Sequence, residues 1–243
     1  IVTKEDPFIL VTPNKNALDI WRGLSGLKQK RKLKVQVIPL KPSKFFFDFT
    51  NSKILGFFDT LVRIFFVGYS HLINFLSPYH SEICNIEEAN DFDMDNFFNS
   101  EELRGDRSNT FLKWRTSYRP STCYQFVKVK KNKSVIGYGL FSKPKNYRNL
   151  KPLILLDMVA VPKHRKAVLK SLGRFGVLQH KDIDLLIFMA AIPNLKFHFL
   201  SCLPFISVPN RFLPDANDAF FELRSNLISN KEIYITLFDC DMF

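Results

Sequence analysis

Apolar residues recur at two spacings along this chain, every second residue in some segments and every third or fourth in others. Alternation over Leu33–Leu40 and nearly continuous apolar runs at Leu153–Val161 and Asp184–Ala191 predict strands. Further strands are expected at Pro7–Val11, Cys123–Lys131, Val135–Ser142, Phe205–Phe212 and Lys231–Phe238. Helices are expected at Asn14–Leu24, Ile54–Leu76, Asp95–Leu103, Asn109–Tyr118, His164–Leu178 and Asn194–Leu203. This order predicts an α/β fold with a mixed, partly parallel sheet and helices on both of its faces.

The segment Ile54–Leu76 is the most hydrophobic of the chain and is long enough to raise the question of a membrane span. Asp59 and Arg63 lie inside it, and polar residues recur along one side of the expected helix, which leaves a broad apolar face. A charge at the centre of a bilayer costs about 2.5–3.5 kcal/mol. The pattern therefore favours a buried or interdomain helix, with a helix on a membrane surface second and a span third.

Charge is spread unevenly along the chain, which holds 35 Lys and Arg against 23 Asp and Glu and has a formal net charge of +12. An acidic stretch over 81–106 precedes a strongly basic block over 107–200. The block reads either as solvated faces or as a domain that meets anions. Nucleic acid is the less favoured partner, because no recognition helix, zinc motif or RNA motif accompanies the lysines. The 26 Phe residues are expected to fill the core.

Four cysteines, Cys84, Cys123, Cys202 and Cys240, lie far apart and have no metal-ligand spacing. We therefore expect no structural metal and a reducing compartment, the cytoplasm. No signal peptide opens the chain, and it begins with Ile1 rather than Met, so we expect a fragment of a longer protein.

Two segments of the chain share one plan. Phe8–Val11 and Ile187–Ala190 are each followed closely by Pro-Asn, at Asn14 and Asn194, then by an expected helix and a further strand. A repeat of supersecondary units predicts duplicated domains.

The repeated unit resembles the C-terminal half of the GNAT (N-acetyltransferase) superfamily, whose pattern is a strand, N-x-x-A-x-x-x-Y and a last pair of strands. Asn14, Ala17 and Trp21 follow that spacing, whereas the second copy keeps Asn194 and carries Phe197 and Ser201 in place of Ala and Tyr. The resemblance implies a tandem-GNAT bacterial protein with a truncated first domain. It divides the chain into the C-terminal part of a first unit over 1–50, a connecting amphipathic helix over 51–80 and a second GNAT-like domain over 81–243.

In that family the diphosphate of acyl-CoA lies on backbone N–H groups at a helix start, in a Q/R-x-x-G-x-G/A loop. The matching loop here, Pro162–Val168, has no glycine but several cations, which leaves a modified phosphate site and a degenerate loop equally open. The resemblance also implies that the strand Leu153–Val161 splays from Asp184–Ala191 and opens a slot. The acyl-thioester would lie in that slot and pair with the backbone of Val159 and Val161. The residues expected to bind the cofactor are Val159, Val161, Lys163, His164, Arg165, Lys166, Ala167 and Asn194.

Catalytic residues stay open. Asp157 is a base or, as is commoner for a strand-end Asp, a hydrogen-bonded structural group, and His164 and His198 have no catalytic partner in sequence. The first expectation is an acyl-CoA-dependent N-acyltransferase that uses acetyl-CoA or another acyl-CoA on a small amine or amino sugar. The alternative is a catalytically degenerate GNAT scaffold that binds a substrate or partner. We expect no metal and no membrane span, and a peripheral membrane contact is left open.

Overall fold

The computed structural model describes most of the central chain and several separate strands near its ends. The described residues are 8–11, 29–46, 53–85, 97, 102–104, 107, 109–117, 124–144, 146, 149–192, 195, 204–208, 218–223 and 232–236.

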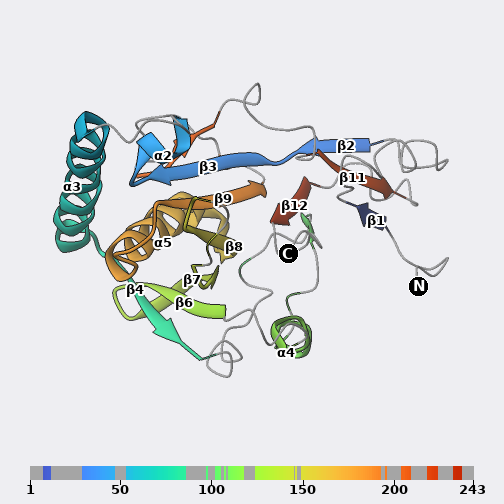
Figure 1. Ribbon diagram of the computed structural model, residues 1–243. Helices are drawn as coiled ribbons and strands as arrows, with labels where there is room; N and C mark the ends of the chain where they lie inside the picture. Colours follow the sequence, from blue (N-terminus) through green and yellow to red (C-terminus); the bar gives the residue numbers. More distant parts are fainter. Residues whose placement is uncertain are drawn as a thin grey trace.

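Nine strands within these residues form one sheet, whose main path runs β10–β3–β9–β8–β7–β6–β4 (Figure 1). The strands of this path are β3 (Lys34–Pro39), β4 (Tyr79–Cys84), β6 (Tyr124–Lys131), β7 (Ser134–Ser142), β8 (Pro152–Ala160), β9 (Leu185–Ala191) and β10 (Ile206–Ser207). Only the β8–β9 pair of this path is parallel, and the other neighbours are antiparallel. Beside the path, β12 (Glu232–Thr236) pairs with β9 and with β5 (Glu102–Arg104).

The two ends of the chain exchange strands. A second, three-stranded sheet has the order β1 (Phe8–Val11), β11 (Asp218–Leu223), β2 (Gln29–Lys32), so a late strand lies between two early ones. In return, β3, which continues β2 after Leu33 (Figure 1), lies between β9 and β10 in the large sheet. The predicted division at 50 and 81 stays a prediction, but strands from both sides of it pair with each other.

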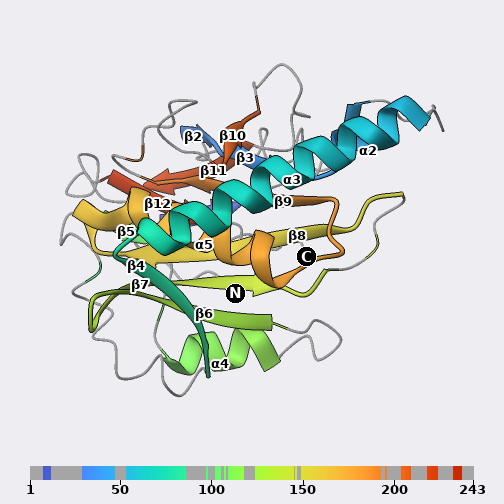
Figure 2. The same ribbon diagram turned by 90° about the vertical axis from the view of Figure 1, so that its left-hand side faces the viewer.

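Helices cover both faces of the large sheet. α5 (Arg165–Gln179) packs on one face, where Leu172 and Phe175 join Leu155 and Met158 of β8 in the main core. α3 (Lys53–Leu76) crosses outside α5 and adds Phe66 to the same core (Figure 2). On the opposite face, the α4 helix (Asn109–Ser117) brings a buried leucine onto residues of β4, β6, β7 and β8; this smaller cluster is Leu112, Cys84, Phe126, Leu140 and Leu156. The predicted mixed α/β sheet flanked by helices is confirmed.

Most predicted elements within the described residues are present, with ends shifted by one or two positions, but the strand predicted over Phe205–Phe212 already ends at Ser207. The helix predicted over Asp95–Leu103 is wrong at its end, because Glu102–Arg104 form β5, which pairs in parallel with β12. Strand pairing there overrides the local helix propensity of the sequence. Unpredicted elements are β2, β4, β11 and the short α2 helix (Pro42–Phe46). The predicted helices over Asn14–Leu24 and, apart from Leu195, Asn194–Leu203 lie outside the described residues.

The orientation of α3 differs from the expectation of a buried apolar face. Its polar side faces the protein: the Asp59 carboxylate accepts hydrogen bonds from the backbone N–H of Ser43, at 2.9 Å, and from the Ser43 hydroxyl, and Ser70 is fully buried. Eight large apolar side chains on the other side are 48–87% exposed, namely Phe57, Phe58, Leu61, Ile64, Phe65, Leu72, Phe75 and Leu76. The prediction that phenylalanines fill the core is therefore wrong for four of those on α3. Among the described helices none is long and apolar enough to cross a membrane.

Candidate functional site

The parallel strands β8 and β9 separate part-way along their length. They pair from Pro152 and Leu185 as far as Leu155 and Phe188, and no pairing between them continues beyond that point. The register between β7 and β8 shifts at the same level, after Leu140, where β8 holds one extra residue. A bulge bends the strand that contains it. The two strands therefore part beside the second half of β8, as the family resemblance implied.

The opening is occupied by the chain's own β12. Ala190 of β9 pairs with Lys34 of β3 on one side and with Thr236 of β12 on the other, and Ala191 pairs with Ile235. Since β3 takes one side of β9, β12 lies on the side that faces β8. The backbone groups of β9 in the opening are thus used by β12 instead of being presented to a ligand.

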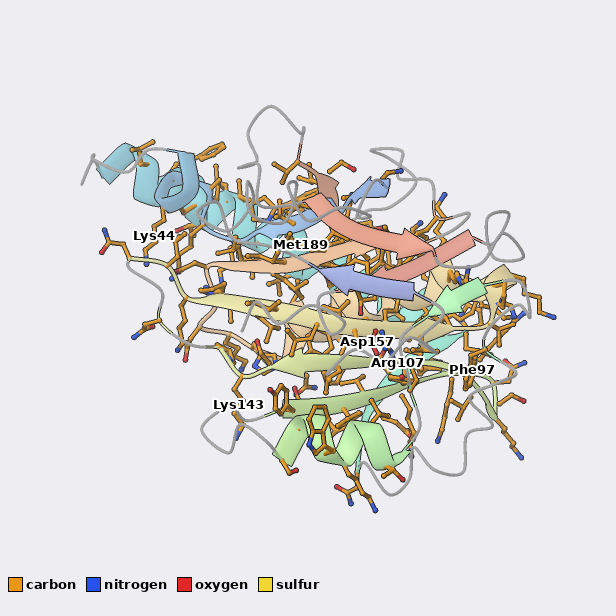
Figure 3. All side chains as sticks on the ribbon, turned by 90° about the vertical axis from the view of Figure 1, so that its right-hand side faces the viewer. Lys44, Phe97, Arg107, Lys143, Asp157 and Met189 are labelled. Carbon is orange, nitrogen blue, oxygen red and sulfur yellow. The ribbon has the colours of Figure 1, made fainter. Side chains whose placement is uncertain are left out.

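A buried polar network closes the contact between β12 and β8. Thr236 donates its hydroxyl to Asp157 Oδ1 at 2.8 Å, and Arg107 Nε lies 2.8 Å from Asp157 Oδ2. Arg107 Nη2 lies 3.3 Å from both Asp157 Oδ1 and Thr236 Oγ1. All three side chains are at most 3% exposed. Figure 3 shows Arg107 and Asp157 side by side at the sheet. This geometry favours the structural reading of Asp157 over a base.

Backbone groups at the start of α5 are bonded within the protein. A 3-10 turn, Pro162–His164, precedes the helix; in it the His164 N–H donates to the Val161 carbonyl at 2.8 Å and the Arg165 N–H donates to the Pro162 carbonyl. The Val161 N–H donates to the Ile136 carbonyl of β7 at 3.0 Å. An anion site at a helix start requires amides that point at the ligand without an internal partner. The amides of Val161, His164 and Arg165 do not meet that condition.

The charged side chains of the same loop point to different surroundings. Lys163 and Lys166 are exposed, whereas Arg165 is only 2% exposed. The His164 ring lies against the Tyr79 ring, with 6.0 Å between centroids and 3.4 Å between His164 Nδ1 and Tyr79 Oη. Partial burial, together with the nearby Lys131 and Lys163, lowers the pKa of His164. His164 is therefore the side chain that joins this loop to Tyr79, the first residue of β4.

Of the remaining predicted cofactor residues, the structure describes Val159 and Ala167. Val159 is fully buried and packs with Phe97 and Tyr138, and Ala167 is half-buried in the first turn of α5. Asn194 lies outside the described residues, as do Ser201 and His198. Their predicted roles stay predictions.

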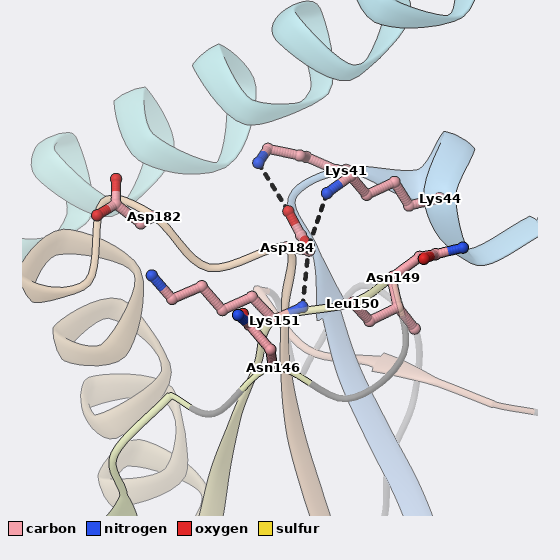
Figure 4. A pocket seen from close by; sticks show the side chains of 8 residues that line it. All are labelled: Lys41, Lys44, Asn146, Asn149, Leu150, Lys151, Asp182 and Asp184. Atoms are coloured by element: carbon pink, nitrogen blue, oxygen red, sulfur yellow. Dashed lines mark hydrogen bonds and ion pairs between the residues drawn. The ribbon is translucent and has the colours of Figure 1, made fainter. Parts of the chain in front are cut away.

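A polar cavity of about 360 Å³ lies where the central strands β8 and β9 begin, at the opposite ends of these strands from the opening (Figure 4). The sequence did not indicate it, because its residues come from three loops that are far apart in the chain: Lys41, Lys44, Asn146, Asn149, Leu150, Lys151, Asp182 and Asp184.

Asp184 holds these loops together. Its carboxylate is 2.7 Å from Lys41 Nζ and 3.1 Å from Lys44 Nζ, and it accepts a hydrogen bond from the Lys151 N–H at 2.9 Å. Burial by itself raises the pKa of Asp184, but the hydrogen bonds from Lys41, Lys44 and Lys151 outweigh it, so the pKa is lowered. Because three groups of the protein already bind its carboxylate, we interpret these contacts as a structural clasp between the strand ends rather than as a ligand site.

The lysine-rich hairpin β6–β7 is partly neutralised. Glu82 of β4 lies 3.1 Å from Lys128 Nζ and 2.5 Å from Lys130 Nζ. Hydrogen bonds from Lys130 and Lys128 lower the pKa of Glu82. In the part of the chain that the structure describes, no cluster of His, Cys, Asp or Glu could hold a metal ion.

No known family model and no curated protein matches this sequence. Solved structures similar to it include a GCN5-related N-acetyltransferase from Anabaena variabilis ATCC 29413, at 11% identity and a TM-score of 0.45 over 89% of this chain and 46% of that one. A functionally unknown conserved protein from Staphylococcus epidermidis ATCC 12228 is 12% identical, with a TM-score of 0.44 over 87% of this chain and 68% of its own. A conserved protein of unknown function from Bacteroides thetaiotaomicron VPI-5482 is 9% identical, with a TM-score of 0.41 over 88% and 68%. The chain thus spans less than half the length of the first of these proteins, and likeness at this level concerns the fold alone.

Proposed function

We propose that this chain is a GNAT-like scaffold that binds a partner or substrate, and that it does not transfer acyl groups at the opening between β8 and β9. The observation that carries this proposal is the pairing of β12 with Ala190 and Ala191, because these backbone groups would otherwise line the opening. The Thr236–Asp157 hydrogen bond and the Arg107–Asp157 ion pair hold β12 there.

The start of α5 supports the same proposal. A diphosphate is best held by several unbonded amides and by glycines that let the backbone approach it. The amides of Val161, His164 and Arg165 are bonded internally, and the Arg165 side chain is buried. Two exposed lysines, Lys163 and Lys166, provide charge without that geometry.

The second candidate is the acyl-CoA-dependent N-acyltransferase acting on a small amine or amino sugar. It is favoured by the separation of β8 and β9 after Leu155 and by the exposed Lys163 and Lys166 at the start of the next helix. For this candidate to hold, β12 must leave the opening before acyl-CoA enters.

Calorimetric titration with acetyl-CoA separates the two candidates. The scaffold proposal predicts no saturable heat for the unaltered chain. It predicts none for Ile235→Pro either, a change that removes the backbone N–H and disfavours the pairing of β12 with β9. Circular dichroism checks that the variant remains folded. Micromolar binding to the unaltered chain, lost in Lys163→Glu/Lys166→Glu, contradicts the proposal. Binding that arises only in Ile235→Pro supports the transferase with β12 as a plug.

A further inference from the structure

The side of α3 that faces away from the protein carries eight large exposed apolar side chains between Phe57 and Leu76. We call it the outward face, and its large side chains are Phe57, Phe58, Leu61, Ile64, Phe65, Leu72, Phe75 and Leu76. At about 1.5 Å per residue the 24-residue helix is about 36 Å long. Large contiguous apolar patches on a protein surface mark sites that contact something else.

The helix is held in this orientation from its inner side. Asp59 is bonded to Ser43 of α2, Phe66 is buried in the main core, and Val62 and Val67 pack against that core. Turning the outward face inward would break the hydrogen bond between Asp59 and Ser43 and would remove Phe66 from the main core. These contacts fix the orientation of α3 and leave the outward face exposed.

Basic side chains lie beside the C-terminal end of α3. Lys131 Nζ lies 5.9 Å from the centre of the Tyr79 ring, three residues after the helix ends, and the Asn132 N–H donates to the Pro78 carbonyl at 3.4 Å. Lys163 directly precedes His164, whose ring contacts the Tyr79 ring. We call Lys131, Lys133 and Lys163 the lysine cluster, and both Lys133 and Lys163 are exposed.

We propose that the outward face of α3 lies in the surface of an anionic lipid bilayer, with the lysine cluster on the lipid phosphates. Helices that bind in this way bury an apolar face about 5–10 Å deep, between the headgroups and the acyl chains, and are strengthened by flanking cations. Each Lys near an anionic surface adds about 1 kcal/mol. The net charge of +12 favours the same partner.

The chemistry of the outward face fits lipid better than a second copy of the chain. A protein interface normally carries hydrogen-bonding groups at about one per 100–200 Å² and a polar rim. Exposed polar side chains on α3 are confined to the margins of the face, as at His71, and the Thr60 hydroxyl is bonded to the helix's own backbone at Gly56. An apolar band with cations at one end can bind without specific hydrogen bonds. A bilayer surface offers such binding, through acyl chains for the band and phosphates for the cations.

Vesicle flotation tests the apolar part of the proposal. The full chain is mixed with phosphatidylcholine vesicles in which a third of the lipid is phosphatidylglycerol, and we expect it to float with them. Phe65→Asn/Leu72→Asn should weaken this binding at least about tenfold, since two large side chains no longer enter the bilayer. The matched control is Trp114→Asn, because Trp114 is 52% exposed on α4, on the opposite face of the sheet. This variant should bind the vesicles as the unaltered chain does.

The same vesicles test the lysine cluster. Lys133→Glu/Lys163→Glu should weaken binding to the anionic vesicles about tenfold or more, and added salt should do the same. Lys181→Glu is the matched control, because Lys181 is an exposed lysine beyond the far end of α5. Binding to vesicles of phosphatidylcholine alone should be weak for every variant.

Three results would overturn the proposal. The chain could stay unbound at all lipid compositions, or Trp114→Asn could reduce binding as much as Phe65→Asn/Leu72→Asn does. Light scattering could also reveal a dimer that Phe65→Asn/Leu72→Asn dissociates, in which case a second copy covers the outward face. Circular dichroism and melting temperature confirm that the variants fold, which is expected because all substituted side chains are exposed. The proposal does not depend on whether acetyl-CoA binds.

Discussion

Asp157 lies at the point where β8 turns away from β9, and its surroundings explain why a carboxylate is tolerated inside the sheet. Along β8, Leu155 faces the α5 side, and after the bulge Met158 and Ala160 face that side again. The bulge changes which side chains of β8 point to each face, and Asp157 contacts Arg107 and Thr236. The sequence identified Asp157 as the one carboxylate of the strand, but it could not identify Arg107, which follows a long acidic stretch.

A double-mutant cycle on Arg107 and Asp157 tests this network. Arg107→Met or Asp157→Val alone should lower the free energy of unfolding by about 3–5 kcal/mol, because each leaves a buried charge without its main partner. The double variant should cost clearly less than the sum, by about 2 kcal/mol or more. Urea denaturation measures all four proteins. Strictly additive costs would mean that the two side chains do not interact in solution.

The free energy of unfolding should depend on pH through Asp184. Its pKa is lowered in the folded state, so the unfolded chain takes up this proton first as the pH falls. The stabilisation is present at pH values above the ordinary aspartate value of about 4 and is lost as the pH falls below it. Asp184→Asn should cost about 2 kcal/mol at pH 7 and less at pH 3, measured by urea denaturation.

The neighbouring Asp182 is the control for that measurement. It is exposed in the same loop, so Asp182→Asn should change the free energy of unfolding by no more than about 0.5 kcal/mol at either pH. An equal loss in both variants, or a loss in Asp184→Asn that does not shrink in acid, would exclude the clasp.

Among the elements, α3 shows best what hydrophobic spacing can and cannot predict. The pattern correctly predicted one long helix with an apolar and a polar side, and it placed Asp59 and Arg63 inside it. The expectation that the apolar side is buried was wrong. The polar side faces the protein because Asp59 accepts a hydrogen bond from Ser43 of α2, a helix that the sequence did not predict. Periodicity defines the faces of a helix, whereas tertiary partners select between them.

Two glycines should respond in opposite ways to alanine. Gly68 lies on the exposed side of α3 with nothing within 4 Å of an added Cβ, so Gly68→Ala should stabilise the protein by up to about 1 kcal/mol. At Gly137 of β7 an added Cβ would lie 2.5 Å from the Val159 carbonyl oxygen and 2.9 Å from Ala160 Cβ, so Gly137→Ala should destabilise it by about 1–3 kcal/mol. Melting temperatures measure both changes, and a neutral Gly137→Ala would contradict the close approach of β7 to the end of β8.

At the scale of the whole molecule, the exchange of β3 and β11 between the two ends was beyond sequence reasoning. The strand over Leu33–Leu40 was predicted, but local alternation carries no information about which distant strand it joins. Its partner β9 begins about 150 residues later, and the opening beside β9 was expected to hold a cofactor rather than β12. Pairing between strands far apart in the sequence decides both where β3 lies and which strand fills the opening.

Removal of residues 1–50 tests how far the chain is interlocked. Without β3, the neighbours β9 and β10 lose the strand between them, and the core loses Ile38 and Leu40, which are fully buried. The shortened chain should lack a cooperative thermal transition in near-ultraviolet circular dichroism. A transition at the melting temperature of the full chain would mean that the second predicted unit folds alone.

The occupation of the β8–β9 opening by β12 is tested most directly by amide hydrogen exchange, followed by mass spectrometry with and without acetyl-CoA. Peptides that contain Glu232–Thr236 and the end of β9 report on the pairing of these strands. We predict protection in both peptides and no change when acetyl-CoA is added. Rapid exchange over 232–236, or protection of β9 that rises with acetyl-CoA, would contradict this account and favour an acyl-CoA site.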